Sequence, residues 1–423
     1  MLDVFASTPS NSSDNDIDIS PNHRSLRRAS YFDPKTVIQR PPMRVASPAN
    51  NFVHDVTVEP LHICGRPVPI DHNIDMLIMH KYHTSCPLRN KPPEDTTIVY
   101  LGSHTNAYGD GGPGGKEGAG TGNNLIELLH ALQYARDNDA VLVIKLWTWP
   151  ISLITMMWIE NQNNDWTAWR SFVEQALCIK IVDDDSDFDQ YRAVIRKENT
   201  KELFRLVHDA NNDDASLEEY IEYQSYIIRT LFRSYNKGIG TRASKHVNVT
   251  LPASNMCSVL SGIHELNSID TYSVIHSRSG VSHNLLQVSK RSGTDRKAAV
   301  SMEPDYIKSI LAPLGMLNRP ILFICDGKHP EILERLMADS DIGPWIQIPS
   351  DSSWVGGDIT AGIMATVFIG NPGSTFSGFI AKSRYALGFT DTYLFRKRDA
   401  GGVWGNACDN ICIFNKNIMN MHS

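Results

Sequence analysis

The first sustained apolar pattern in the chain begins at Thr96. Residues 96–101 (TTIVYL) and 140–144 (AVLVI) are short runs of strand-forming residues. Between them, behind a possible N-cap at Asn123, apolar residues recur at helical spacing: Leu125, Leu128, Leu129, Leu132 and Ala135. A strand, a glycine-rich loop, an amphipathic helix and a strand in this order predict a βαβ unit, and therefore a parallel sheet.

A second α/β series follows a different middle segment. Residues 160–240 are rich in Asn and Asp, and the capping box at 216–219 opens an amphipathic helix that we expect to continue through Tyr235. After it come predicted strands at 272–275, 321–325, 346–348 and 367–369, and predicted helices at 305–311, 330–336, 359–365 and 379–383. The sequence thus predicts an α/β protein with two doubly wound domains, residues 92–268 and 269–423, facing a cleft.

The N-terminal residues lack such a pattern. Residues 1–60 are dominated by Ser, Asn, Asp and Pro, which predicts a disordered arm, and they lack the apolar stretch of a signal peptide. The most apolar stretch of the chain, residues 140–159, contains Lys145, Thr148 and Pro150 and is too interrupted for a membrane span.

Composition adds two limits. Forty Lys and Arg against 47 Asp and Glu give a formal net charge of −7, which argues against a general nucleic-acid-binding surface but allows a local anion site. Seven cysteines in 423 residues are too few for a disulfide scaffold, and they leave the cellular compartment undecided.

In open α/β sheets, ligands bind beyond the carboxyl ends of the strands. The glycine-rich loop at 109–122 fits neither a Walker A loop nor a dinucleotide fingerprint, and residues 103–118 are equally compatible with a surface insertion. Residues 120–124 differ, because they lie against a helix start. The amides of Asn123 and Asn124 could meet a ligand there.

Two further strand ends carry polar side chains. His276 and Arg278 follow a predicted strand and project to the same side of it, and Arg is suited to grip a diphosphate. Ser374, Thr375 and Ser377 lie among glycines between a predicted strand and a predicted helix. Hydroxyls and backbone N–H groups at the positive end of a helix predict an anion site.

Asp183 to Asp185 form a competing site after another strand-like run. Paired carboxylates there could hold Mg²⁺ or Mn²⁺ against a nucleotide diphosphate. Asp187 and Asp189 extend the run, which favours a solvated acidic surface instead. No Cys or His residues have the spacing of a zinc site.

Three of these motifs together resemble the fucosyltransferase superfamily that includes protein O-fucosyltransferases and α1,6- and α1,2-fucosyltransferases. They are Gly122-Asn123-Asn124, the segment from His276 to Arg278, and the segment from Asp358 to Ser377. Their order and spacing are similar to those of the family. The similarity covers about residues 96–139 and 271–388.

The resemblance implies a GT-B fold of two Rossmann-like domains and an inverting transfer of fucose from GDP-fucose to a protein or glycan, without a metal or another cofactor. It implies that Arg278 grips the β-phosphate and neutralises the leaving GDP. The remaining donor contacts that it implies are His276, Asp326 and Asp358 at the nucleotide, Ser374, Thr375, Phe376 and Ser377 at the diphosphate, and Asn123 and Asn124 from the other domain.

The resemblance also implies the lumen of the Golgi or the endoplasmic reticulum, whereas residues 1–60 show no signal or anchor. Val281 occupies the place of an acid that follows the family's His-x-Arg motif, Ser279 replaces a second Arg, and no residue qualifies as general base. Three alternatives stay open: a GT-B enzyme using another nucleotide sugar, a metal-dependent enzyme using Asp183 to Asp185, and a non-catalytic nucleotide-sugar- or glycan-binding protein.

Overall fold

The computed structural model describes twelve stretches of the chain: residues 60–87, 91–101, 121–145, 174, 176–182, 188–197, 214–243, 271–277, 303–325, 330–349, 355–371 and 374–394. All of them lie in one compact unit, Asp55–Ser423. The predicted arm at 1–60 falls outside these stretches except for its last residue. The division into domains at residue 268 stays a prediction.

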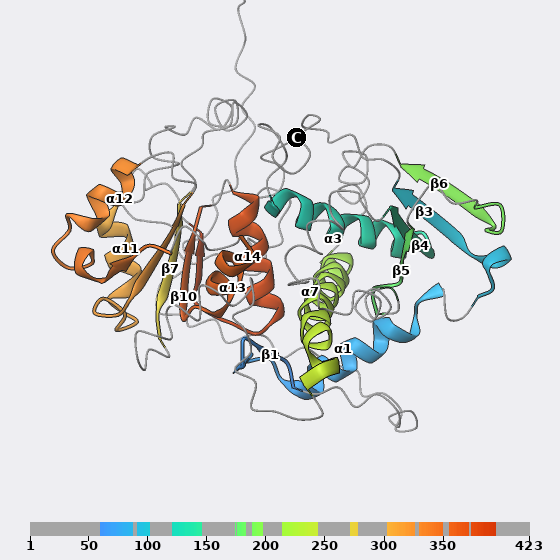
Figure 1. Cartoon of the computed structure of the whole chain (residues 1–423), viewed down its shortest axis with the longest axis horizontal. Helices are drawn as coiled ribbons and strands as arrows, with labels where there is room; N and C mark the ends of the chain where they lie inside the picture. Colours follow the sequence, from blue (N-terminus) through green and yellow to red (C-terminus); the bar gives the residue numbers. More distant parts are fainter. Residues whose placement is uncertain are drawn as a thin grey trace, which may run out of the picture. The chain divides into compact units, whose positions relative to one another are not determined.

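The first sheet contains the predicted βαβ unit (Figure 1). Its strands β3 (Thr97–Leu101), β4 (Ala140–Lys145), β5 (Ile179–Val182) and β6 (Ala193–Lys197) are all parallel, in the order β5-β4-β3-β6. Helix α3 (Thr121–Asp137) forms the crossover from β3 to β4. Alternate residues of β4 are buried on opposite faces, Val141 in one core cluster and Leu142 in another, as expected for a parallel sheet.

The second sheet is also parallel, and the α/β class predicted from the sequence is therefore confirmed. Its order is β11 (Thr392–Leu394), β10 (Val367–Gly370), β7 (Ser273–Ser277), β8 (Ile321–Cys325) and β9 (Ile346–Gln347). Helices α11 (Pro304–Leu311) and α12 (Pro330–Met337) cover one face, and α13 (Val355–Met364) and α14 (Thr375–Ala386) cover the other. Strand β11 had no counterpart among the predicted elements.

Ordered structure starts before Thr96, contrary to the sequence pattern. A hairpin of β1 (His62–Ile63) and β2 (Arg66–Pro67) precedes helix α1 (His72–Thr84), and the short 3₁₀ turns η1 (Pro93–Asp95) and η2 (Gly343–Trp345) lie beside β3 and β9. Helix α1 mixes apolar residues with histidine, lysine and a buried Asp75, so no clear apolar stripe marks it. Asp75 is paired with Arg233 and Arg229 of helix α7 (Asp214–Ala243).

Cysteines contribute covalent structure as well. Cys86, just after α1, forms a disulfide with Cys178, just before β5, and their Cα atoms lie 5.5 Å apart. Cys64 is also disulfide-bonded, whereas Cys325 is an exposed free thiol. The pairing that the sequence left open therefore includes a link between α1 and the first sheet.

Helices α3, α7 and α14 pack against one another. Their apolar side chains belong to one continuous core with those of the second sheet, including Leu129 of α3, Ile227 of α7 and Phe379 of α14. Every helix among the described residues is too short or too charged to cross a membrane. These three helices position the candidate site.

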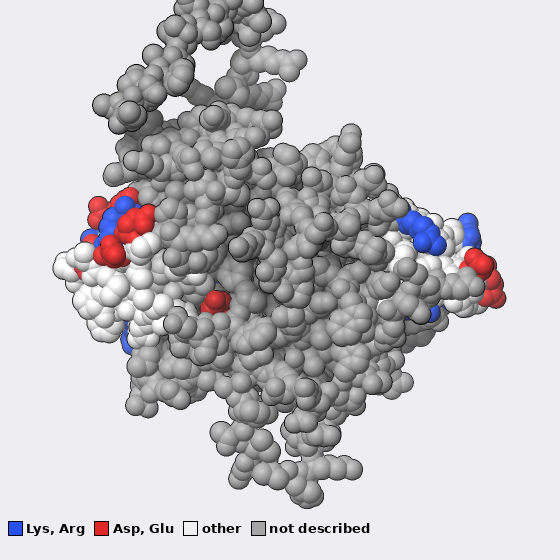
Figure 2. Space-filling model, turned by 45° about the horizontal axis from the view of Figure 1, so that its top comes forward, with Lys and Arg blue, Asp and Glu red and all other residues white. Residues whose placement is uncertain are grey.

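The outer helices α11 and α12 carry surface charges of both signs close together (Figure 2). Lys308 Nζ lies 2.9 Å from Asp339 Oδ2 and 3.4 Å from Asp305 Oδ1. Arg335 Nη1 lies 3.6 Å from Glu303 Oε1. These surface pairs contribute little to stability. They neutralise one another locally on this face.

Candidate functional site

The candidate site lies where β10 turns into α14. Ser374 is the N-cap residue, its N–H donates to Asn371 O (3.1 Å), and the first bond inside the helix runs from Gly378 N–H to Ser374 O (2.9 Å). The helix therefore starts at Thr375 rather than at the predicted residue 379. Backbone N–H groups before Gly378 lie outside the helix's own hydrogen bonding, at the end that carries a partial positive charge.

Two buried hydroxyls at this edge of the sheet have no hydrogen-bond partner among the described residues. Ser374 is 2% exposed and makes no side-chain cap bond, and Ser277, the last residue of the neighbouring strand β7, is 1% exposed. Leaving a buried hydroxyl unsatisfied costs about 1–3 kcal/mol. Such groups in a folded protein call for an explanation, and a bound polar ligand is one.

His276 of β7 lies directly against the first turn of α14. Its Nδ1 atom is 2.6 Å from Ser377 Oγ, and its ring lies 4.8 Å from the ring of Phe376 at 40°. Ser377 Oγ also accepts a hydrogen bond from Asn371 N–H (2.9 Å). The structure thus brings together three of the residues that the sequence singled out, because β7 and β10 are adjacent parallel strands that end at one edge.

Gly122 brings the start of α3 to the same place. A Cβ atom on Gly122 would lie 2.3 Å from the backbone N of Phe376 and 2.5 Å from the backbone C of Thr375. No side chain fits at that distance, so glycine permits the N-terminal ends of α3 and α14 to touch. Asn123 and Asn124 are in this first turn of α3; their side chains lie outside the part that the structure describes.

The other predicted residues divide into two groups. Arg278 and Asp326 lie outside the described residues, each immediately after a described strand, β7 and β8 respectively. Asp183 to Asp185 also lie outside them, directly after β5. Asp358 is described, half-buried in the first turn of α13.

Two cations, Lys382 and Arg384, lie in α14 after Ser374 to Ser377. Arg384 has a structural role. Its guanidinium is fully buried and donates hydrogen bonds to carbonyls at the end of α13 and around β11, including Ile363 O (2.8 Å) and Thr390 O (2.6 Å). It also donates to Thr392 Oγ1 (2.8 Å). Burial lowers the pKa of Arg384 to about 10, so it stays charged while it joins α13 to β11.

Lys382, the second cation, lies in a buried polar cluster between α3, α7 and α14. Its Nζ atom donates to Gln224 Oε1 (3.1 Å) and lies 5.8 Å from the Tyr220 ring. Burial lowers the pKa of Lys382 to about 7, and burial together with Lys382 lowers the pKa of His130 to about 3. The sequence pattern did not predict the cluster itself, because its members interrupt apolar helix faces singly.

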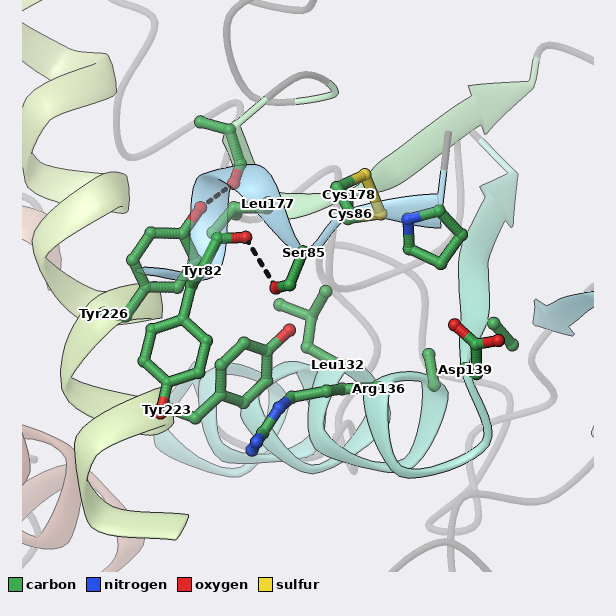
Figure 3. A pocket seen from close by; sticks show the side chains of 14 residues that line it. Tyr82, Ser85, Cys86, Leu132, Arg136, Asp139, Leu177, Cys178, Tyr223 and Tyr226 are labelled. Atoms are coloured by element: carbon green, nitrogen blue, oxygen red, sulfur yellow. Dashed lines mark hydrogen bonds between the residues drawn. A yellow bond between two sulfur atoms is a disulfide. The ribbon is translucent and has the colours of Figure 1, made fainter. Parts of the chain in front are cut away.

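A cavity of about 230 Å³ lies at the opposite end of α3 (Figure 3). The cavity lies next to the amino ends of β4 and β5. It is lined by the Cys86–Cys178 disulfide, Arg136 and three tyrosines, Tyr82, Tyr223 and Tyr226. Arg136 lies 4.8 Å from the Tyr223 ring and is paired with Glu219. Arg136 lies 14 residues after Gly122 in α3, which corresponds to about 20 Å along the helix at 1.5 Å per residue. The cavity is therefore not part of the candidate site.

Further polar groups of the cavity have protein partners. Tyr82 OH donates to Glu222 Oε1 (2.8 Å), Ser85 Oγ donates to Tyr82 O (3.0 Å), and Asp139 is paired with Lys91. The first pair joins α1 to α7, the second closes the end of α1, and the third joins Lys91 to the turn between α3 and β4. We assign no ligand to this cavity.

Within the described stretches, no group of three or more His, Cys, Asp or Glu residues is arranged to hold a metal ion. The expectation of a metal-independent reaction remains a prediction, since Asp183 to Asp185 are outside those stretches.

Comparisons with known proteins give matches among solved structures only. No family model matches the chain, and no curated protein does. The chain is similar to POFUT1 in complex with GDP, at a TM-score of 0.34 and 12% identity, over 72% of this chain and 99% of that one. It is similar to a variant of Arabidopsis thaliana FUT1 in complex with GDP, at a TM-score of 0.37 and 11% identity, over 79% and 82% of the two chains. For E. coli ADP-heptose LPS heptosyltransferase II the TM-score is 0.27 and the identity 10%, over 77% of this chain and 97% of that one.

Proposed function

We propose that the chain is a glycosyltransferase of GT-B architecture that transfers fucose from GDP-fucose to a protein or glycan. The observation that supports this most directly is the N-terminus of α14, where the buried Ser374 hydroxyl has no partner among the described residues. The start of α3 lies against it through Gly122. The nucleotide diphosphate would bind at this edge of the second sheet.

The proposal rests on the electrostatics of helix ends. Each helix N-terminus is equivalent to about half a positive charge, and its N–H groups are donors for phosphate oxygens. Two such ends in contact favour a ligand with more than one negative charge, such as a diphosphate. Backbone groups of Thr375, Phe376 and Ser377, together with the Ser374 hydroxyl, would bind it.

Arg278 would provide the positively charged side chain in this site. It directly follows Ser277 at the end of β7, the strand that lies beside β10. A guanidinium there would grip the β-phosphate with parallel charge-assisted hydrogen bonds and stabilise the charge that develops on the leaving GDP. The transfer would then invert the sugar carbon and need no metal.

The nucleotide and sugar would be held by side chains from several elements. We propose that His276, Asp326 and Asp358 contact the nucleotide from the second sheet, and that Asn123 and Asn124 approach the donor from the start of α3. The acceptor would enter from the side of the first sheet.

Nucleotide binding measured by calorimetry tests the proposal. We expect GDP to bind more tightly than UDP or ADP, and Ser374→Ala to weaken GDP binding by about tenfold, the loss of one hydrogen bond of about 1.4 kcal/mol. The matched control is Ser273→Ala, which removes an equally buried hydroxyl without a described partner at the amino end of β7. Equal effects of the two substitutions would contradict the site, and equal affinities for GDP, UDP and ADP would remove the donor assignment.

Catalysis needs its own measurement. Arg278→Ala should abolish fucose transfer from labelled GDP-fucose with little change in the melting temperature. Val281, in the place of the family's acid, favours one alternative, a non-catalytic nucleotide-sugar-binding protein. GDP-fucose binding without transfer by the wild type would identify that alternative.

A further inference from the structure

The hydroxyl of Ser377 is enclosed by protein atoms of the described residues. Ser377 is fully buried, and its Oγ atom lies 2.6 Å from His276 Nδ1 and 2.9 Å from Asn371 N. Gly370 packs over it, since a Cβ atom on Gly370 would lie 2.8 Å from Oγ. A ligand that reached this oxygen would have to displace protein atoms.

The position of the proton between Ser377 and His276 follows from counting donors and acceptors. The N–H group of Asn371 can only donate, so Ser377 Oγ accepts from it. If His276 Nδ1 also carried a proton, two donors would point at Oγ, and the hydroxyl proton would have no acceptor within the described surroundings. That arrangement costs about 1–3 kcal/mol. The hydroxyl therefore donates to Nδ1.

A neutral imidazole with an accepting Nδ1 carries its proton on Nε2. We propose that Ser377 is a positioning residue that fixes His276 in the Nε2–H tautomer, presenting an N–H donor at the carboxyl edge of the second sheet. The ring of Phe376, 4.8 Å away, restricts the orientation of the imidazole. Ser377 thus acts through His276 rather than by a side-chain contact with the donor.

The consequence for ligand binding rests on the proposed function. If a nucleotide diphosphate sugar binds at this edge, an Nε2–H group selects an oxygen acceptor of the nucleotide, whereas the other tautomer would present a lone pair to it. Electron-pair repulsion between that lone pair and a phosphate or hydroxyl oxygen would weaken binding. The tautomer itself does not depend on the identity of the ligand.

Long-range proton–nitrogen NMR of the full chain labelled with ¹⁵N-histidine measures the tautomer directly. The chain has 15 histidines, and the signal that disappears in His276→Asn identifies His276. We expect the wild type to show the proton on Nε2, without any nucleotide present. Ser377→Ala should release the ring into a mixture of tautomers and weaken GDP binding by about tenfold.

Ser383→Ala is the matched control, because Ser383 is another fully buried serine of α14 whose hydroxyl has no partner among the described residues. It should leave the His276 signal as in the wild type. A proton on Nδ1 in the wild type, or an unchanged tautomer in Ser377→Ala, would overturn the inference. If Ser377→Ala fails to fold, the wild-type spectrum alone decides. The expected tautomer without GDP binding would refute the proposed function and leave the inference standing, and GDP binding with the wrong tautomer would do the reverse.

Discussion

Replacing Lys382 by Met should remove a pH dependence of stability that the wild type shows above neutral pH. The ammonium group is fully buried between α3, α7 and α14, and Gln224 Oε1 accepts its hydrogen bond at 3.1 Å. His130 on α3 and Tyr220 on α7 face it, and burial keeps both uncharged at neutral pH. Because burial disfavours the charged form, the pKa of Lys382 falls from its ordinary 10.5 to about 7.

The sign and size follow from proton linkage. The unfolded chain keeps the ordinary pKa and binds the proton throughout, whereas the folded chain releases it above about pH 7. The unfolded state therefore binds more protons, and the free energy of unfolding rises with pH. Between about pH 7 and about pH 9 the increase is about 2 kcal/mol. Below about pH 7 the lysine is charged in both states, and its contribution is constant and least favourable.

Urea unfolding of the full chain at about pH 7, 8 and 9 measures this slope. Lys382→Met should unfold with a free energy that stays flat over this range, apart from a constant offset for the lost bond to Gln224. The control is Lys81→Met, whose side chain is 52% exposed on α1 and whose loss should leave the wild-type slope intact. Higher pH is avoided because buried Tyr220 and Tyr223 have raised pKa values and would add an opposite slope. Equal slopes for the wild type and Lys382→Met would refute the reasoning.

Three other substitutions test the contacts that hold this region. Gly122→Ala should lower the melting temperature and weaken GDP binding, since its Cβ would lie 2.3 Å from backbone of α14, whereas Gly378→Ala, whose Cβ meets only one methyl at 3.9 Å, should change both little. Arg384→Lys should lower the free energy of unfolding by about 3 kcal/mol, because an ammonium lacks the planar fork that reaches several carbonyls at once; a change below about 0.5 kcal/mol would contradict this. Replacing both Cys86 and Cys178 by Ala should lower the free energy of unfolding by roughly 4 kcal/mol, given their sequence separation of 92, with unchanged midpoints in urea as the contrary result.

Most strands of both sheets could be predicted because they are short runs of β-branched residues, whereas the edge strands β6 and β11 were not predicted. The convergence of His276 with Phe376 and Ser377 also followed from the sequence. Both segments come directly after predicted strands, and parallel strands end at the same edge. The exact helix start did not follow, since Thr375 to Gly378 carry the small and hydroxyl residues typical of turns but form the first turn of α14.

Other features depend on tertiary contacts that local patterns do not carry. Helix α1 is stabilised by the pairing of Asp75 with Arg233, about 160 residues away in sequence, and the disulfide pairing of Cys86 cannot be deduced from spacing. Arg384 resembles a solvent-exposed cation in sequence. Its burial becomes favourable only when the carbonyls at the end of α13 and around β11 surround it.

The buried cations in and against α14 also bear on which charge the proposed diphosphate site uses. Arg384 joins α14 to α13 and β11, and the Nε–H group of Arg229 donates to Ala386 O (2.7 Å) at the C-terminal end of α14, where the helix dipole favours a cation. Lys382 lies two residues before Arg384 in α14 and bonds to Gln224 of α7. With its middle and its end fixed, α14 holds its first turn rigidly against α3, which preorganises the N–H groups there. None of these three cations is available to a ligand at that end, so the positive side chain that a diphosphate requires must come from another element, and Arg278, next after β7, is the cation we propose.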